Sequence, residues 1–406
     1  LPVKINNLIL NDSLIFLPSD NNLIPGKNYD SPVDFFIKDF AIPSDLDFSK
    51  NDSISLKISY QIAGTNNPNI IDVFPWDNYK EGLVTNDFIR KEDDVYKFKF
   101  ITKNEDNKHI VFKSGIHNIE ESIHIPSGYE VIIPEGTSLN LINKASIISK
   151  SPVFLRGSEE RPILVTSSDS TGQGLFVLKA NKRSIMNHVI FENLSSPSKN
   201  SWSLTGAITF YESDISIDKS RFINNIRGDD YLNIVRSDFS INNSRFVNVK
   251  ADAFDADFSF GEMNKNIFKN CGNDGIDISG TKMVIENILM DNIGDKALSS
   301  GEMSDLTAKN IEIRGSEIAI CAKDNSVINI SNAFLHFNKI AITAFQKKPE
   351  FGPAQIIGSN VEITNAQNSF LIESKSKLIL DGNEIKSNNE RVKDLLYGVI
   401  YGKSSK

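Results

Sequence analysis

The sequence predicts an all-β protein, built mainly as a right-handed parallel β-helix with a small antiparallel β-sandwich-like module before it. The first observation is a 22-residue repeat that runs from residue 230 to residue 346. It aligns an apolar column at Leu232, Phe254, Ile276, Leu298, Ile320 and Ile342. Two residues later, a second column is apolar or small: Ile234, Ala256, Ile278, Ser300, Ala322 and Ala344. Alternation with a period of two indicates a strand, and a fixed repeat of this length indicates strands that stack from coil to coil.

A second strand recurs in every coil and supports the same fold. Its tripeptides begin at residues 220, 244, 266, 287, 310 and 332, so their spacing is 21 to 24 residues. Each tripeptide opens with Asn or Ser, and Asn tolerates the left-handed backbone of a tight turn. A leucine-rich repeat has a similar length, but it requires the LxxLxLxxN pattern and a helix, and neither is seen.

The composition argues against two classes of partner. The 406 residues carry a net charge of −8 and no cluster of Lys and Arg, which argues against nucleic acid. No apolar run approaches the roughly 18 residues of a membrane span. The hydrophobic content of 40% is enough for a large core. The chain opens at Leu1 without a signal peptide, so we expect a processed chain or a piece of a longer protein.

Residues 1–107 lack the repeat and are expected to form the β-sandwich-like module. Residues 54–62 alternate apolar and polar side chains, and residues 96–100 alternate aromatic residues with Lys. Such alternation is typical of antiparallel strands with one buried face. Trp76 is interpreted as an anchor of the core or of a loop.

The β-helix is expected over residues 108–390, with a C-terminal cap and tail over 391–406. The repeat breaks once, because the strand that should follow Ile342 after 22 residues appears 28 residues later, at 370–372. The six extra residues are assigned to a basic, aromatic loop at 347–353.

The two cysteines are predicted to be free and packed. Cys271 and Cys321 are 50 residues apart, which places them on different columns and more than two coils apart. Coils rise by about 4.8 Å each, so the two thiols are too far apart for a disulfide.

Acidic and basic residues gather on the outward columns of the central coils. Asp230, Asp252, Asp274 and Lys296 are in register, as are Asp255 and Asp277. Neighbours in a column lie about 4.8 Å apart, and carboxylates that close need a cation, a shared proton or abundant water. Further charged residues stand in the adjacent columns: Asp257 with Lys323, and Arg236 with Glu302 and Asp324.

Three interpretations of this surface stay open. It is a solvated face at the corners of the coils, or Asp255, Asp257 and Asp277 bind Ca²⁺, which takes several carboxylate oxygens. In the third, catalysis is added, and Lys296 or Lys323 removes the C5 proton of a Ca²⁺-bound uronate as a general base. Hydrolysis would instead use a carboxylate pair, either Asp255 with Asp277 or Asp277 with Glu302.

The candidate residues are therefore assigned by role. The catalytic candidates are Asp277, Lys296, Glu302 and Lys323. The candidates for substrate binding are Arg236, Asp324, Lys347, Lys348 and Phe351. The metal candidates are Asp255, Asp257 and Asp277, with Ca²⁺ as the candidate cofactor.

The repeat resembles the right-handed parallel β-helix of pectate lyases and polygalacturonases. Polygalacturonase-type hydrolases carry an Asp-Asp pair, a Gly-His-Gly and an Arg-Ile-Lys. Asp229 and Asp230 provide such a pair, but the other two motifs are missing, which weakens the hydrolase hypothesis. The segments 272–280, 294–302, 322–324 and 345–353 look like β-helix regions of large bacterial surface or secreted proteins, some of which lie downstream of a CotH-type kinase-like domain. That resemblance implies an extracellular location but supplies no catalytic residues, and no ATP-binding Gly-rich loop is seen here.

The leading hypothesis is a secreted or cell-surface protein that recognises a polysaccharide or surface glycan through this acidic and Lys-containing groove. The first alternative is an enzyme on the same groove, and a polysaccharide lyase or epimerase is preferred over a glycoside hydrolase. The second alternative is a structural rod in a surface fibre, which would associate with itself or with neighbouring domains of a larger protein through its N-terminal strands.

Overall fold

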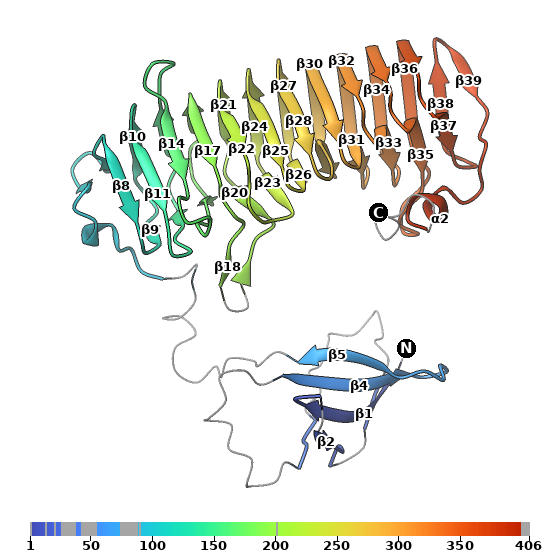
Figure 1. The fold of residues 1–406 in the computed structure, drawn as a ribbon, viewed down its shortest axis with the longest axis horizontal. Helices are drawn as coiled ribbons and strands as arrows, with labels where there is room; N and C mark the ends of the chain where they lie inside the picture. The colour runs from blue at the N-terminus through green and yellow to red at the C-terminus, as the bar shows by residue number, and fades with distance from the viewer. Residues whose placement is uncertain are drawn as a thin grey trace. The chain divides into compact units, whose positions relative to one another are not determined.

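The computed structural model of the protein describes residues 2–12, 14–19, 22–25, 38–41, 55–73, 88, 91–199 and 202–398. Its contacts divide the chain into two compact units, Leu1–Leu83 and Val84–Lys406. Nearly all regular structure in both units is strand (Figure 1). No helix in the described part of the chain is long and apolar enough to cross a membrane.

The described residues of the first unit form one antiparallel sheet. Its strands are β1 (Val3–Leu10), β2 (Leu14–Phe16), β3 (Leu23–Ile24), β4 (Leu56–Ile62) and β5 (Asn69–Val73). They are ordered β2-β1-β4-β5, and β3 pairs with β1. The strand predicted from the alternation at 54–62 is thus confirmed as β4, which pairs with β1, and Leu8, Leu10 and Phe16 form a small buried core in this sheet. Trp76 lies outside the described residues.

The predicted strand at residues 96–100 is wrong. Val95–Lys97 is a 3-10 helix, η2, and a turn follows it before the next strand begins at Ile101. Phe98 and Phe100 pack against the core of the second unit. The alternation of aromatic residues with Lys led to the wrong prediction, because single aromatic residues that cover the end of a solenoid can reach its core without forming a strand.

The second unit is a parallel β-helix of about twelve turns with about 22 residues per turn. One of its sheets, the front sheet, has eleven strands among the described residues. They are β9 (Ile123–Ile125), β12 (Ile147–Ser149), β15 (Leu175–Leu178), β20 (Gly206–Tyr211), β23 (Asp230–Val235), β26 (Asp252–Asp257), β29 (Ile276–Ser279), β31 (Lys296–Gly301), β33 (Ile318–Lys323), β35 (Ile340–Phe345) and β37 (Asn368–Ile372). Each pairs in parallel with its equivalent one coil later, as the repeat predicts.

Among the described residues, 21 further strands of this unit form a sheet that bends around the other sides of the coil. They are β6 (Ile101–Asn104), β7 (His109–Phe112), β8 (Ile116–Ile119), β10 (Glu130–Pro134), β11 (Ser138–Leu141), β13 (Val153–Arg156), β14 (Ile163–Thr166), β16 (Ser184–Asn187), β17 (Val189–Glu192), β21 (Ile215–Asp218), β22 (Arg221–Ile223), β24 (Asp238–Asn242), β25 (Arg245–Val249), β27 (Phe260–Asn264), β28 (Ile267–Cys271), β30 (Lys282–Ile293), β32 (Asp305–Arg314), β34 (Val327–His336), β36 (Gln355–Thr364), β38 (Lys377–Leu380) and β39 (Asn383–Ile385). Early coils contribute two strands each to this sheet. In the coils of β30, β32, β34 and β36, one long strand spans both positions, as shown by the pairing of both β27 and β28 with β30.

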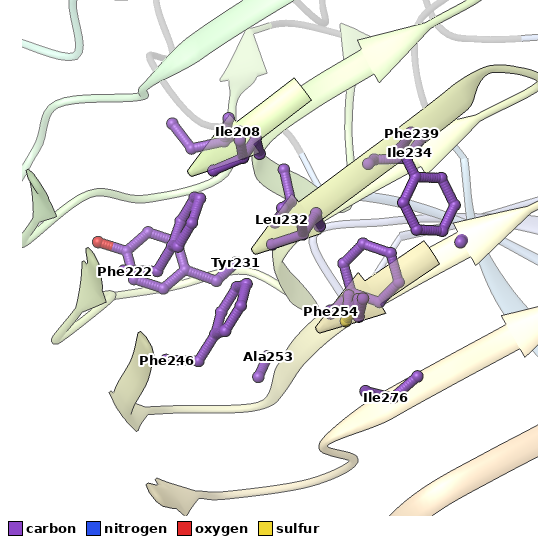
Figure 2. Packing of buried hydrophobic residues seen from close by; sticks show 14 of the residues in the cluster. Ile208, Phe222, Tyr231, Leu232, Ile234, Phe239, Phe246, Ala253, Phe254 and Ile276 are labelled. Atoms are coloured by element: carbon purple, nitrogen blue, oxygen red, sulfur yellow. The ribbon is translucent and has the colours of Figure 1, made fainter. Parts of the chain in front are cut away.

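The core follows the predicted inward columns. Leu232, Phe254 and Ile276 are fully buried, as is Ser300 at the one polar position of the second column. Phe222, Phe246 and Phe268 stack across successive coils, with ring centroids 4.5 and 4.8 Å apart and nearly parallel planes. Figure 2 shows Phe222 and Phe246 beside the strands that carry Leu232 and Phe254. Cys271 and Cys321 are buried and packed, as predicted.

Asparagine residues fix the bends of the long strands. Asn287, Asn310 and Asn332 have φ between 53° and 56°, in the left-handed region. Each donates its side-chain N–H to the Oδ1 of the Asn one coil earlier, at 2.9 to 3.2 Å. The predicted turn role of Asn is confirmed, and the amide ladder satisfies side chains that would otherwise compete for the backbone.

The end of the β-helix folds back onto the front sheet. Ile342 pairs with Phe370, so the predicted insertion between these strands is confirmed. After β39, helix α2 (Val392–Leu396) follows. Its Val392 and Leu396 cover the outward side chains of Ile318 and Ile340 in one buried cluster. A segment without the repeat therefore shields one stretch of the outward face of the front sheet.

Candidate functional site

A pocket of about 630 Å³ opens on the outward face of the front sheet, next to α2. Its floor comes from β29, β31 and β33, one wall from the corners that precede these strands, and another from the end of α2. Its charged and aromatic lining residues are Asp229, Lys250, Asp274, Asp277, Asp295, Lys296, Glu317, Lys323, Lys347 and Tyr397. The solenoid brings them together because equivalent positions of adjacent coils lie one strand spacing apart.

Two buried aspartates extend the backbone ladder below the pocket. Asp252 Oδ1 accepts a hydrogen bond from the backbone N–H of Asp274 at 2.7 Å. Asp274 Oδ1 in turn accepts one from the backbone N–H of Lys296 at 3.0 Å. Burial is the main cause that raises the pKa of Asp252 to about 8 and that of Asp274 to about 6. Repulsion from Asp274 adds to the shift of Asp252, whereas Lys296 limits that of Asp274.

Two buried lysines reach the pocket and stay protonated. Lys296 Nζ lies 2.6 Å from Asp295 Oδ2 and 3.5 Å from Asp274 Oδ1. Burial disfavours its charge, but these two carboxylates outweigh burial and raise its pKa. Lys323 Nζ lies 3.6 Å from Asp277 Oδ1; burial is the largest single influence and lowers the pKa of Lys323, but Asp277, Cys321 and Asp274 together outweigh it and raise the pKa. Both lysines are therefore hydrogen-bond donors and cations at neutral pH.

The loop at 346–353 brings a third lysine to the pocket. Asp324 is fully buried, and its Oδ1 accepts the backbone N–H groups of Lys347 at 2.6 Å and Lys348 at 2.7 Å. These bonds hold the loop against the front sheet. Lys347 Nζ then lies 5.2 Å from the ring centroid of Tyr397, in a cation–π contact. Burial is the main cause that lowers the pKa of Lys347, and Lys323 and Lys296 contribute.

Lys348 pairs with Glu302 outside the pocket. Their Nζ and Oε1 atoms are 2.5 Å apart, and Ser279 donates its hydroxyl to Glu302 Oε2 at 2.5 Å. Burial raises the pKa of Glu302, but these two partners outweigh it and the pKa is lowered. Glu302 is thus ionised at neutral pH, where it accepts hydrogen bonds and does not act as a proton donor.

We expect Asp324→Ala to release the 346–353 loop and to lower the free energy of unfolding by about 1.5–3 kcal/mol, because two hydrogen bonds to a buried carboxylate are lost. Asn325→Ala is the matched control, since Asn325 also has a positive φ but is exposed. Urea denaturation measures both, and trypsin cleavage after Lys347 reports the loop, since Lys348 precedes Pro349 and is not a trypsin site. Equal effects of the two substitutions would contradict the anchoring role of Asp324.

A second group of carboxylates lies toward the N-terminal side of the pocket. Asp255 and Asp277 are register partners on β26 and β29, and Asp255 Oδ2 accepts a hydrogen bond from Asn233 Nδ2 at 2.6 Å. Burial first, then repulsion from neighbouring aspartates, raises the pKa of Asp255 and of Asp257. Within the described residues, no three His, Cys, Asp or Glu side chains are arranged so that they could hold a metal ion. The calcium site stays a prediction, which a calcium titration of the wild type and of an Asp255→Asn/Asp277→Asn double variant would test.

The structure divides the predicted site residues into two sets. The pocket collects Asp277, Lys296, Lys323 and Lys347. The remaining candidates do not line it: Asp255, Asp257, Arg236, Glu302, Asp324, Lys348 and Phe351. Arg236 donates to the hydroxyl of Tyr211, and the carbonyl of Phe351 accepts a hydrogen bond from Gln346 inside the loop. Sequence reasoning missed Tyr397, because it follows the last repeat and no column predicts its position.

The comparisons with known proteins identify no family. No family model matches the sequence, and no curated protein matches it. Among solved structures, the chain resembles an alginate lyase from Paenibacillus sp. strain FPU-7, with a TM-score of 0.35, 11% identity, and coverage of 60% of this chain and 91% of the lyase. It also resembles the catalytic domain of GH87 α-1,3-glucanase, with a TM-score of 0.39, 12% identity, and coverage of 68% of this chain and 64% of that one.

A further similar structure is tailspike protein 3 of bacteriophage CBA120, with a TM-score of 0.29, 9% identity, and coverage of 70% of this chain and 57% of the tailspike. The chain spans less than two thirds of the glucanase and tailspike chains. At these identities and TM-scores, the similarities say nothing about the chemistry of the pocket.

Proposed function

We propose that the protein binds a polysaccharide and that sugar hydroxyls occupy the pocket on the front sheet. The observation that carries this proposal is the side-by-side placement of Lys296 and Lys323 with Asp274 and Asp277 in one pocket of about 630 Å³. A sugar hydroxyl accepts a hydrogen bond from an ammonium and donates one to a carboxylate. The volume is in the range of small-ligand sites, about 300–1,000 Å³.

The charge of the pocket favours a neutral or amino-sugar glycan over a polyuronate. Five carboxyl groups and four lysines line it, so its carboxyl groups outnumber its lysines by one. The whole chain carries a net charge of −8. An acidic polysaccharide would be repelled on approach, whereas neutral hydroxyls and ammonium groups would not.

Among the enzyme alternatives, the best supported is one in which carboxylic acids transfer the protons. A general base must be unprotonated, and the pKa values of Lys296 and Lys323 are raised, so neither is placed to take a proton at neutral pH. Asp274 has a pKa raised to about 6 and lines the pocket, so it is the better candidate for a proton donor. Release of reducing ends from neutral glycans would indicate hydrolysis, and unsaturated products from uronates would indicate a lyase.

The test is calorimetric titration with cello-, laminari- and manno-oligosaccharides as neutral probes, chitosan oligomers as cationic probes, and oligomers of alginate and polygalacturonate as anionic probes. We expect binding of a neutral or cationic probe, and a loss of affinity of roughly tenfold in Tyr397→Ala and in Lys347→Ala, which each remove one lining side chain. Lys282→Ala, an exposed lysine of β30 outside the pocket, should bind like the wild type. Absence of binding by all probes would reject the proposal.

A secreted or cell-surface location belongs to the same proposal, as does a position near a CotH-type domain in a longer protein. The resemblance of segments such as 272–280 and 345–353 to β-helix regions of bacterial surface proteins supports both. Fractionation of cells that produce the protein, with detection by an antibody against this chain, tests the location. Detection in the cytoplasmic fraction alone would count against it.

A further inference from the structure

The outward face of the front sheet is covered at two places, and between them the outward residues Val235, Asp257 and Ser279 are partly exposed. At the C-terminal end, α2 covers Ile318 and Ile340. Toward the N-terminal end, the outward Phe176 is fully buried and its ring meets that of Trp202, with centroids 6.0 Å apart. Trp202 belongs to the hairpin of β18 (Ser198–Lys199) and β19 (Trp202–Ser203). Figure 1 shows this hairpin and α2 on the same side of the β-helix.

A second pocket, of about 410 Å³, lies beside this hairpin. Its lining is almost entirely apolar and comes from Leu178, Trp202, Leu204 and Tyr211, together with Ser127, Lys150 and Lys179. Trp202 and Tyr211 are both partly exposed. The pocket is thus an open aromatic surface and not a part of the closed core.

Charged and polar groups line the edge of this aromatic pocket. Arg236 Nη1 donates to the Tyr211 hydroxyl at 3.1 Å, and Glu212 lies 3.7 Å from both Arg236 Nη1 and Lys179 Nζ. A pyranose ring has the matching character, because its C–H groups form an apolar face and its hydroxyls point outward around the ring. The indole and the phenol would cover that face, while the charged edge would receive the hydroxyls.

The two pockets lie on one continuous surface. Tyr211 on β20 pairs with Val235 on β23, which pairs with Asp257 on β26, which pairs with Ser279 on β29. Three strand spacings therefore separate Tyr211 from the strand that carries Asp277, which corresponds to roughly 14 Å along the axis of the β-helix. That distance suits a few linked sugar residues.

The turns that follow these strands form a wall along the same path. Arg236, Phe258 and Glu302 occupy equivalent turn positions, and Phe258 is 60% exposed. Its ring lies over Gly280, where a Cβ would come within 2.7 Å of it. The wall thus runs from the aromatic pocket to the Glu302–Lys348 pair. Gly280 has no side chain, which leaves room for the Phe258 ring.

We infer that the aromatic pocket at Trp202 and Tyr211 is a second saccharide subsite, which binds a pyranose ring of the same glycan that reaches the charged pocket at Lys296 and Lys323. The glycan chain then lies along the axis of the β-helix, between the β18–β19 hairpin and α2. This inference rests on the proposed function and deepens it. It requires a ligand long enough to span both subsites.

Tryptophan fluorescence reports the subsite directly, because Trp202 lines the pocket and the sequence has just one other tryptophan, Trp76. Trp76→Phe leaves Trp202 as the sole tryptophan. Cello-, laminari-, manno- and chitosan oligomers of two to six residues are titrated against this variant by fluorescence and against the wild type by calorimetry. For each oligosaccharide series that binds, we expect the affinity to increase with oligomer length until the oligomer spans both subsites. Binding should also shift the Trp202 emission to shorter wavelength.

Substitution separates the two subsites. Trp202→Ala should weaken binding of the longest oligomers roughly tenfold and leave that of the shortest nearly unchanged. Because Trp202 also packs on Phe176, the milder Tyr211→Phe is included: it keeps the ring but removes the hydroxyl that accepts from Arg236, and should weaken the longest oligomers by a smaller factor. Tyr96→Ala, an exposed tyrosine on η2, is the matched control and should bind all lengths like the wild type.

The outcomes distinguish the inference from the function. Binding with no dependence on chain length and no change in Trp202 emission would overturn the second subsite and leave the charged pocket as the glycan site. A Trp202→Ala variant that only loses thermal stability, with unchanged affinity for long oligomers, would likewise overturn it and assign Trp202 to packing of the chain itself. Absence of binding by every probe would overturn the proposed function and the inference together.

Discussion

Replacing Lys296 with methionine is expected to lower the free energy of unfolding by about 3–5 kcal/mol at neutral pH, because it leaves buried carboxylates without their cation. Lys296 is 5% exposed and lies between Asp295 and Asp274. Asp274, itself 2% exposed, would have to keep an uncompensated charge or bind a proton. Urea denaturation of both proteins at pH 7.5 measures the difference.

Two controls show whether charge or packing causes this loss. Lys282→Met removes an exposed lysine 3.9 Å from Asp305 and should cost about 0–1 kcal/mol. The loss in Lys296→Met should shrink as the pH falls from 7.5 to about 6, because Lys296 limits the raised pKa of Asp274 and without it the acid binds a proton at a higher pH than in the wild type. A loss that is equal to that of Lys282→Met, or independent of pH, would contradict the role of the buried ion pair.

The free energy of unfolding is also expected to fall as the pH rises from about 4 to about 8. Burial and mutual repulsion raise the pKa values of Asp230, Asp252 and Asp274 to about 7, 8 and 6 from 3.8. Between these values the folded state binds more protons than the unfolded state, so stability decreases with pH. Each carboxyl contributes a slope of at most about 1.4 kcal/mol per pH unit. Glu302, whose pKa is lowered, acts in the opposite direction only below its unfolded value of 4.5.

Asp252→Asn tests this origin. Its amide oxygen can still accept the backbone N–H of Asp274, but the charge near Asp230 and Asp274 is gone. The variant should be more stable than the wild type at pH 8.5, nearly equal to it at pH 4.5, and less dependent on pH between them. Asp305→Asn, at a half-exposed position of β32, is the control. The measurement is urea denaturation across this range with EDTA present, and an unchanged slope in Asp252→Asn would refute the assignment.

Much of the pocket floor follows from the repeat. The 22-residue period aligns the columns that contain Asp277, Lys296 and Lys323 without using any side-chain contact. The register of β29, β31 and β33 places these residues as predicted. The 28-residue step after Ile342 likewise located the loop that carries Lys347. These features are predictable because each coil contacts only its neighbours, so a period in the sequence becomes a distance along one axis.

The residues that cover the two ends of this surface could not be predicted from the repeat. Ile318 and Ile340 occupy the same outward column as Asp274 and Lys296, and nothing in the repeat says that α2 covers them. Trp202 and Tyr397 lie in segments without the repeat, yet they form walls of the two pockets. The apolar identity of Ile318 and Ile340 was the one signal of a cover, because an outward position that faced water would not favour it.

A strict repeat converts residue spacing into stacked positions, so the β-helix, its register and the acidic and Lys character of the outward face are all predictable from the repeat. Tertiary structure alone decided which of those charges are buried and paired. Glu302 turns to Lys348, Asp324 anchors a loop, and Lys296 and Lys323 meet their carboxylates beneath a helix that arrives from the end of the chain. Burial and partners depend on contacts between segments far apart in sequence, and for such contacts the repeat carries no information.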